Sequence, residues 1–373
     1  MSSTTPQCAG YDLVVVGAGA IGLACAWRAA RDGLSVAVLE RDRPGTGASG
    51  VAAGMLAPVT EADFGEEGLL ALNREGRALW GDFAALLEDR SGISPGYVDS
   101  GCLVVAADRD DAEELRRLHA LQQRLGLSAE WLTPRAARGL EPGLSPRIAG
   151  AISAPGDGQV DAPAVVAALE RALMADGGEL IAGAEVAELM RDGDRVAGVR
   201  TIDGLEVRAP SVLIAAGAWS GAGGLGALPG APQVRPVKGQ LLELRVRAGR
   251  PAPVGRVVRT PRCYVVPRAD GRVVVGATTE EQGFDLTVTA EGVFRLLEAA
   301  MEVLPDVGEL ELQRARAGLR PGTPDGRPVV GAAGPEGLLW ATGHGRNGVL
   351  LAPLTAERVL GLLRAPTATG ATG

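Results

Sequence analysis

A glycine-rich turn near the N terminus has the residue spacing of a site for a phosphate-containing ligand. Gly17-Ala-Gly19-Ala-Ile-Gly22 directly follows the apolar run Tyr11–Val16, and Glu40 ends the next apolar run. The first glycine permits a tight turn, the second lets the backbone approach a pyrophosphate, and the third lets helix and strand pack closely. A carboxylate at the second strand end can accept hydrogen bonds from both ribose hydroxyls. The pattern predicts a dinucleotide site, and the acid disfavours a ligand with a 2′-phosphate.

Two strands and a helix must hold this turn in place. Tyr11–Val16 and Leu34–Leu39 are short apolar runs that predict buried strands, and Ala20–Arg31 between them has helical spacing. Strand, helix and strand within about 30 residues are typical of a parallel βαβ unit. The next segment, Arg41–Gly54, is rich in small residues, which let a backbone run close to an extended cofactor. This segment favours FAD over NAD.

The rest of the chain mixes helical and antiparallel patterns. Asp161 predicts the N-cap of a helix that runs to about Ala175, and Asp270-Gly271 predicts a tight turn. Further helices are expected at 66–90, 108–125 and 290–303, and strands at 240–246, 256–258, 264–266 and 273–275. We therefore predict an α/β fold, α+β overall, in which an antiparallel-sheet substrate domain is inserted into a Rossmann-like FAD-binding domain. The FAD-binding domain would comprise residues 1–85, 150–230 and 316–373, and the substrate-binding domain residues 86–149 and 231–315.

Composition and charge exclude several classes of protein. The 373-residue chain has a net charge of −8 and 3% aromatic residues, which disfavours a nucleic-acid partner. No apolar run is long enough for a transmembrane helix, and residues 1–10 lack the pattern of a signal peptide. Cys8, Cys25, Cys102 and Cys263 form no Cys-x-x-Cys pair, so no metal site is predicted and a reducing compartment suits the chain. We expect a cytoplasmic protein without a membrane partner.

A series of ordered segments resembles the D-amino-acid oxidase superfamily of FAD enzymes, and within it the bacterial glycine oxidases of the ThiO type. The resemblance extends from about Asp12 to Leu360. The matching segments are Ala53–Leu56, Pro236–Gln240, Cys263–Arg268, Gly276–Thr278, Ala317–Thr323, Asp325-Gly326 and Gly343–Pro353.

The resemblance implies roles for several side chains around a substrate. Arg320 would clamp the substrate carboxylate, for which the planar fork of a guanidinium is suited. Tyr264 would lend its hydroxyl to the same carboxylate and shield the flavin. Arg346 would border the substrate pocket, and Met55 would stand near the flavin ring.

Three residues depart from the family pattern. Thr279 replaces a methionine, Arg262 replaces a histidine, and Gly345 replaces an aromatic residue of the last glycine-rich loop. Positions two apart on a strand share a face, so Arg262 would add positive charge beside Tyr264 at the pocket mouth. We therefore expect Thr279 and Arg262 in a pocket that is roomier or more cationic than that of a strict glycine oxidase.

The expected FAD contacts come from the first βαβ unit, the small-residue loop and the loop that opens the last helix. The backbone of residues 344–350 would bind the pyrimidine end of the flavin, where N–H groups stabilise negative charge. The His344 side chain is expected to be structural, and Cys263 is misplaced for covalent attachment, so FAD should bind non-covalently. The expected contacts are Gly17, Gly19, Ala20, Ile21, Gly22, Glu40, Arg41, Ala48, Ser49, Ala53, Gly54, Met55, Val186, Gly217, His344, Gly345, Arg346, Asn347, Gly348, Val349 and Leu350.

The resemblance implies oxidation of a small amino acid or amine. Glycine is the first expected substrate, with sarcosine and small D-amino acids as alternatives, and O2 would be reduced to H2O2. Two other readings remain open: a dehydrogenase of D-amino or imino acids with another electron acceptor, and a flavin-stabilised scaffold without turnover. The chain has only two histidines, which disfavours a Ser–His or Cys–His nucleophile. A homotetramer and a place in thiamine thiazole synthesis are implied by resemblance alone.

Overall fold

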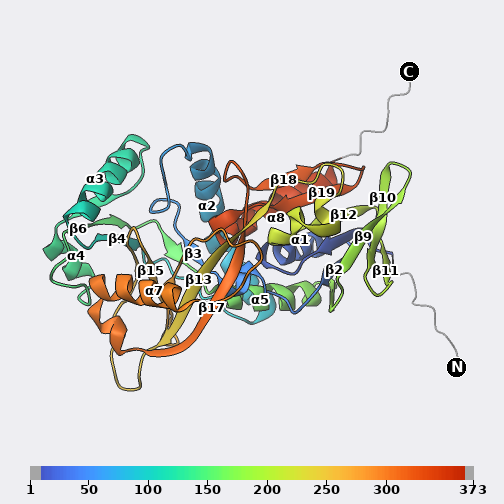
Figure 1. Cartoon of the computed structure of the whole chain (residues 1–373). Helices are drawn as coiled ribbons and strands as arrows, with labels where there is room; N and C mark the ends of the chain where they lie inside the picture. Colours follow the sequence, from blue (N-terminus) through green and yellow to red (C-terminus); the bar gives the residue numbers. More distant parts are fainter. Residues whose placement is uncertain (1–9, 366–373) are drawn as a thin grey trace.

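The computed structural model describes residues 10–365, which form two lobes joined by long strands (Figure 1). Cys8, together with residues 1–9 and 366–373 of the expected domain ranges, lies outside the described residues. The α-helices are α1 Ala20–Arg31, α2 Glu67–Ser91, α3 Arg109–Arg124, α4 Pro134–Leu140, α5 Ala162–Ala175, α6 Gly223–Gly226, α7 Ala290–Val303 and α8 Gly348–Arg364. Short 3-10 turns are η1 Ala48–Val51, η2 Gly217–Gly221, η3 Pro305–Glu309 and η4 Gly345–Asn347. The strands are β1 Leu13–Val16, β2 Val36–Glu40, β3 Met55–Leu56, β4 Cys102–Ala106, β5 Glu130–Leu132, β6 Gly150–Ala154, β7 Gly158–Gln159, β8 Glu179–Ala182, β9 Val186–Asp192, β10 Arg195–Thr201, β11 Glu206–Arg208, β12 Ser211–Ile214, β13 Arg235–Arg245, β14 Val257–Arg259, β15 Tyr264–Pro267, β16 Arg272–Gly276, β17 Glu311–Gly322, β18 Val329–Ala332 and β19 Leu338–Thr342.

A mostly parallel six-stranded sheet carries the glycine turn. Its order is β18-β19-β12-β1-β2-β8, and only the β18–β19 pair is antiparallel. Both faces of such a sheet must be covered, because its strands are apolar on both sides. Val15 of β1 packs in the core with α1, α5 and α8, whereas Val14 packs in a second core with the three-stranded sheet β11-β10-β9. The strand–helix–strand prediction is confirmed.

An eight-stranded sheet forms the other lobe, on the left in Figure 1. Its order is β17-β13-β16-β15-β14-β4-β6-β5, and α7 covers one face with Leu296 and Ala300 against Val273 and Val275. β13 and β17 pair antiparallel along nearly their whole length and run toward the first lobe. These two neighbouring strands therefore connect the two lobes and can place side chains at the boundary between the lobes.

Several element boundaries differ from those expected. α1 and α7 begin and end where the periodicity predicts, but β17 and β6 were not predicted as strands. Both belong to the eight-stranded sheet, although residues 150–230 and 316–373 were assigned to the FAD-binding domain. Asp161 stands at the N-cap of α5, yet its side chain makes no capping bond there, because Arg272 binds its carboxylate. The Asp161 side chain thus forms a long-range ion pair with Arg272 in place of the expected capping hydrogen bond.

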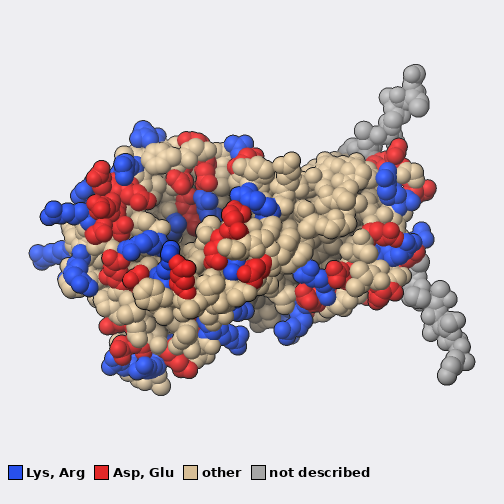
Figure 2. All heavy atoms as spheres, in the orientation of Figure 1, with Lys and Arg blue, Asp and Glu red and all other residues tan. Residues whose placement is uncertain are grey.

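Charges of both signs are interspersed over the face shown in Figure 2, most densely on the lobe with α3, α4 and α7. No helix within residues 10–365 is long and apolar enough to cross a bilayer. Within the same range the three cysteines, Cys25, Cys102 and Cys263, are buried and free.

Candidate active site

A cavity of about 370 Å³ lies where the two lobes meet. Its wall combines the β1–α1 turn, the loop after β2, and η2 of the first lobe with β13, β15 and β17 of the second. The N-terminal end of α8 completes it. A volume of several hundred Å³ at a domain boundary is typical of cofactor sites.

The first helix presents its N terminus to this cavity. Gly17 has a φ of +108°, and a Cβ there would stand 2.6 Å from the Ala215 carbonyl oxygen. A Cβ at Gly22 would stand 1.9 Å from the Gly17 oxygen, so this glycine acts in packing and does not itself line the cavity. No side chain caps α1 at Gly19, and no acid lies in its first turn. Its N–H groups and positive dipole end therefore suit a pyrophosphate.

Glu40 and Ser49 stand beside that helix terminus. The Ala18 N–H donates to Glu40 Oε2 over 2.7 Å, and the Asp42 N–H donates to Glu40 Oε1 over 3.0 Å. The Ala20 N–H donates to Ser49 Oγ over 3.0 Å. Glu40 and Ser49 both line the cavity. A carboxylate oxygen has more than one lone pair, so Glu40 keeps capacity for a ribose hydroxyl.

The small-residue loop is anchored to the second lobe by an arginine that sequence reasoning missed. Arg268, directly after β15, donates to the Ala53 carbonyl and, over 2.9 Å, to the Val160 carbonyl. Gly54 has a φ of +68°, and a Cβ there would stand 2.0 Å from the Val160 oxygen. Met55 follows and lines the cavity. The only sequence signal for Arg268 was its place in a matching segment.

The Arg320 side chain, on β17, lies over Gly239 of the neighbouring strand β13 and reaches the cavity. A Cβ at Gly239 of β13 would stand 2.5 Å from Arg320 Nη2 and 2.7 Å from its Cζ. Arg320 Nη1 donates to the Thr278 carbonyl over 3.1 Å, and no carboxylate among the described residues forms an ion pair with this guanidinium. The remaining N–H groups of the fork are thus available to a ligand carboxylate.

Tyr264 lies at the same end of the cavity. Its ring covers Gly276 of the adjacent strand β16, where a Cβ would stand 2.4 Å from the phenol oxygen. Burial raises the pKa of Tyr264, the charge of Glu61 raises it further, and Arg320 opposes the rise. The phenol therefore remains protonated at neutral pH and lies within the field of both charges.

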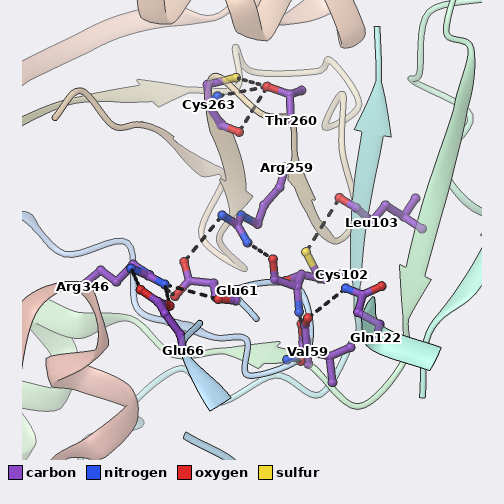
Figure 3. A network of polar contacts seen from close by, with 12 residues as sticks. Val59, Glu61, Glu66, Cys102, Leu103, Gln122, Arg259, Thr260, Cys263 and Arg346 are labelled. Carbon is purple, nitrogen blue, oxygen red and sulfur yellow. Dashed lines mark hydrogen bonds and ion pairs between the residues drawn. The ribbon is translucent and has the colours of Figure 1, made fainter. Parts of the chain in front are cut away.

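Arg346 lines the cavity but is already paired. Its Nη2 donates to Glu66 Oε2 over 2.5 Å, and its Nε lies 3.7 Å from Glu61 Oε2. Figure 3 shows Glu61 between Arg346 and Arg259. Glu61 also lines the cavity, and sequence reasoning missed it. Its signal was its place as the first charge after an uncharged run from Pro44 to Thr60.

The opening of α8 offers a second free helix terminus. No side chain caps this helix at Asn347, whose buried Oδ1 has no partner among the described residues. His344 Nε2 lies 2.9 Å from Thr355 Oγ1, and burial lowers the pKa of the imidazole to about 3. The imidazole is therefore neutral and tied to α8. Backbone N–H groups at this end suit an anionic ring system, as FAD requires in its reduced form.

Most other expected FAD contacts line the cavity, and a few do not. Gly22, Asn347 and Leu350 are not part of the lining. The expected contacts that line the cavity are Gly17, Gly19, Ala20, Ile21, Glu40, Arg41, Ala48, Ser49, Ala53, Gly54, Met55, Val186, Gly217, His344, Gly345, Arg346, Gly348 and Val349.

Two expected pocket residues are placed elsewhere. Arg262 lies in a bend before β15, where its guanidinium is half exposed and paired with Glu302. The strand begins at Tyr264, so the alternation of faces does not extend back to Arg262. Thr279 lies beyond the end of β16 and does not line the cavity, whereas Ala277 does. The positive charge that Arg262 was expected to add at the pocket mouth is therefore absent from the described lining.

Comparison with known proteins gives a consistent result over nearly the whole chain. A family profile described as "FAD dependent oxidoreductase" matches residues 12–361. A glycine oxidase of Geobacillus kaustophilus is 38% identical over 357 residues, which cover 95% of this chain and 93% of that protein. The crystal structure of glycine oxidase from Geobacillus kaustophilus superposes with a TM-score of 0.88, at 36% identity and 96% coverage of each chain.

A second relative is longer than this chain. The bifunctional protein ThiO/ThiG of Trichormus variabilis is 37% identical over 350 residues. The match covers 93% of this chain but 52% of that protein, so this chain corresponds to one half of it.

Proposed function

Because this chain belongs to the DAO family of FAD-dependent oxidoreductases, we propose that it oxidises the Cα–N bond of glycine. Sarcosine and small D-amino acids are alternative substrates under this proposal. The product is an imine, which water hydrolyses to an oxo acid and ammonia or an amine. FAD held by the residues that line the cavity would supply the acceptor for the two electrons of this oxidation, and O2 would take them up as H2O2. The relatives named glycine oxidase support the choice of glycine first.

The observation that best supports this proposal is that Arg320 and Tyr264 lie together on one wall of the cavity. Each side chain lies over a glycine, so both are held against the sheet and face the cavity. The guanidinium binds the substrate carboxylate through two parallel hydrogen bonds, and the phenol donates a third. Fixing the carboxylate holds Cα in the orientation that the reaction needs. Such positioning is the main contribution that a protein can make to this step. A scaffold without turnover has no use for this clamp.

The substrate amine loses its proton without help from histidine. His344 is neutral and bonded to Thr355, and His119 lies on α3 beside Ala129, away from the lining. The amine therefore reacts in its neutral form, and the rate rises with pH as the substrate deprotonates. Backbone N–H groups at the start of α8 stabilise the negative charge that develops on the cofactor side.

The test is a spectroscopic titration of the purified yellow protein. We expect glycine to bleach the flavin band without oxygen, and air to restore it with one H2O2 per turnover. Sarcosine and D-alanine serve as parallel substrates, and L-alanine as a control. Full bleaching without peroxide on aeration, but with reduction of an added dye, would favour the alternative dehydrogenase. No bleaching by any of these amino acids would reject the proposal.

We also place the reaction in the synthesis of the thiamine thiazole. The support is the relative named ThiO/ThiG, in which a matching half is joined to a second half. Loss of this gene product in its own host should then slow growth without thiamine, and added thiazole should restore it. Unchanged growth would remove this assignment while leaving the reaction untouched.

A further inference from the structure

A carboxylate stands on the cavity wall without a role in the reaction proposed above. Glu61 lies in the loop of residues 57–66, between β3 and α2, and its side chain is 10% exposed. It lines the same cavity as Arg320 and Tyr264. Its charge raises the pKa of Tyr264, so it acts on the end of the cavity where the substrate carboxylate is expected.

Two arginines neutralise Glu61 without using its hydrogen-bonding capacity. Arg259 Nη2 lies 3.8 Å from Oε1, and Arg346 Nε lies 3.7 Å from Oε2. The close hydrogen bonds of these arginines go elsewhere: Arg259 to the Thr60 carbonyl and Arg346 to Glu66 (Figure 3). No described residue donates a hydrogen bond to either Glu61 carboxylate oxygen. The carboxylate therefore keeps free acceptor sites beside the cavity.

Hydrogen bonds to Asp157 and Gln122 hold the loop that carries Glu61. The Val59 and Thr60 N–H groups donate to the fully buried Asp157 carboxylate over 3.0 and 2.9 Å. Gln122 of α3 donates to the Val59 carbonyl over 3.0 Å. These bonds come from the second lobe and hold the backbone of the two residues that precede Glu61.

The charges around the cavity end are unevenly balanced. Arg259, Arg346, Glu61 and Glu66 sum to zero, whereas the guanidinium of Arg320, which lines this end of the cavity, forms no ion pair with a described residue. The positive charge of Arg320 can therefore balance the negative charge of one ligand carboxylate. A second anionic group on the ligand would meet the Glu61 carboxylate at a wall with little water, where like charges repel strongly.

We propose that Glu61 sets the charge specificity of this site, so that substrates with one carboxylate are accepted and those with a second anionic group are rejected. Dicarboxylic amino acids and N-carboxymethyl glycine (iminodiacetate) belong to the rejected class. The inference rests on the proposed function, because it assumes that Arg320 holds the first carboxylate. It adds a specificity-determining residue that does not take part in the electron transfer.

The first test uses the FAD-loaded wild-type protein and non-reacting ligands. Acetate and malonate differ by one carboxylate, and both perturb the flavin spectrum when they bind near it. We expect acetate to bind more tightly than malonate in spectral titrations at constant ionic strength. Tighter binding of malonate would overturn the inference. This measurement needs no variant and no turnover, so it stands even if glycine is not the substrate.

The second test compares Glu61→Gln with Glu66→Gln. Both changes remove a charge from the same arginine, but Glu66 is 31% exposed and does not line the cavity. We expect Glu61→Gln to shift the malonate-to-acetate affinity ratio, and the iminodiacetate-to-glycine ratio of kcat/KM, by about tenfold or more toward the dianion. Glu66→Gln should shift them by less than about threefold.

The outcomes separate the two proposals. Equal shifts in both variants, or no shift in Glu61→Gln, would refute the role of Glu61. A wild-type protein that binds acetate but oxidises no amino acid would refute the proposed function, while the malonate-to-acetate ratio would still test Glu61. If Glu61→Gln did not fold, which thermal unfolding would reveal, the wild-type comparison of acetate and malonate would remain decisive.

Discussion

Replacing Gly239 by alanine should disable substrate binding while leaving the fold intact. An ideal Cβ at this position would stand 2.5 Å from Arg320 Nη2, 2.6 Å from Nη1 and 2.7 Å from Cζ. Carbon and nitrogen atoms prefer about 3.5 Å or more, so the guanidinium must move by about 1 Å. It is the far end of a flexible side chain, and β13 and β17 can stay paired while it moves.

The size of the effect follows from this displacement. A 1 Å error in the position of a substrate-holding group costs about 100-fold in rate, or about 3 kcal/mol of transition-state stabilisation. We therefore expect kcat/KM for glycine to fall about 100-fold, with most of the loss in KM for the carboxylate-bearing substrate. The melting temperature, followed by flavin fluorescence, should change by only a few degrees. Initial rates of peroxide formation give the kinetic constants.

Gly331→Ala is the matched control. Gly331 lies in β18 with a negative φ, and an added Cβ would meet no atom within 4 Å. This variant should keep the wild-type kcat/KM. A folded, FAD-loaded Gly239→Ala enzyme with wild-type kcat/KM would show that the guanidinium does not bind substrate from its place over Gly239.

Three further changes test other parts of the site. Tyr264→Phe should raise KM for glycine about tenfold by removing one hydrogen bond, measured by steady-state peroxide formation, and an unchanged KM would exclude the phenol from the clamp. Glu40→Gln should weaken FAD binding on the order of tenfold, because glutamine has one acceptor oxygen in place of two and its NH2 group would face either the Ala18 or the Asp42 N–H; fluorescence titration of the apoprotein would detect it. Burial raises the pKa of Asp157 to about 6 from 3.8, so its contribution to stability is present below about pH 4 and is lost as pH rises to about 6, by up to about 3 kcal/mol. Urea unfolding of Asp157→Asn at a series of pH values should lack that slope, and a parallel slope in both proteins would contradict the assignment.

Sequence patterns predicted the elements that are determined by residues close together in the chain. α1 and the turn before it follow from three glycines and a helical apolar stripe, and α7 follows from periodicity alone. β17 was missed because it is the edge strand of its sheet, and the first four of its residues are exposed. Polar residues in that half, such as Gln313 and Arg314, hide the alternation that marks a half-buried strand.

The site was predictable only where a motif marked it. Arg320 and Tyr264 could be found by resemblance, because they lie within matching segments. Glu61 and Arg268 act through partners 108 or more positions away in the chain, so no spacing rule connects them. Arg262 was misplaced for a related reason: strand alternation holds only inside a strand, and the start of β15 cannot be read to one residue from the sequence.

The first sheet is completed by segments more than 300 residues after β1. β19 lies between β12 and β18, and α8 packs on α1, where Arg28 binds Glu357. A ribosome makes the glycine turn before these segments, so a nascent chain cannot finish this lobe until α8 has left the exit tunnel. Cofactor capture must therefore wait for the synthesis of α8. Chains arrested before β19 should hold no flavin and expose an apolar sheet face, which makes them early targets for proteases and chaperones.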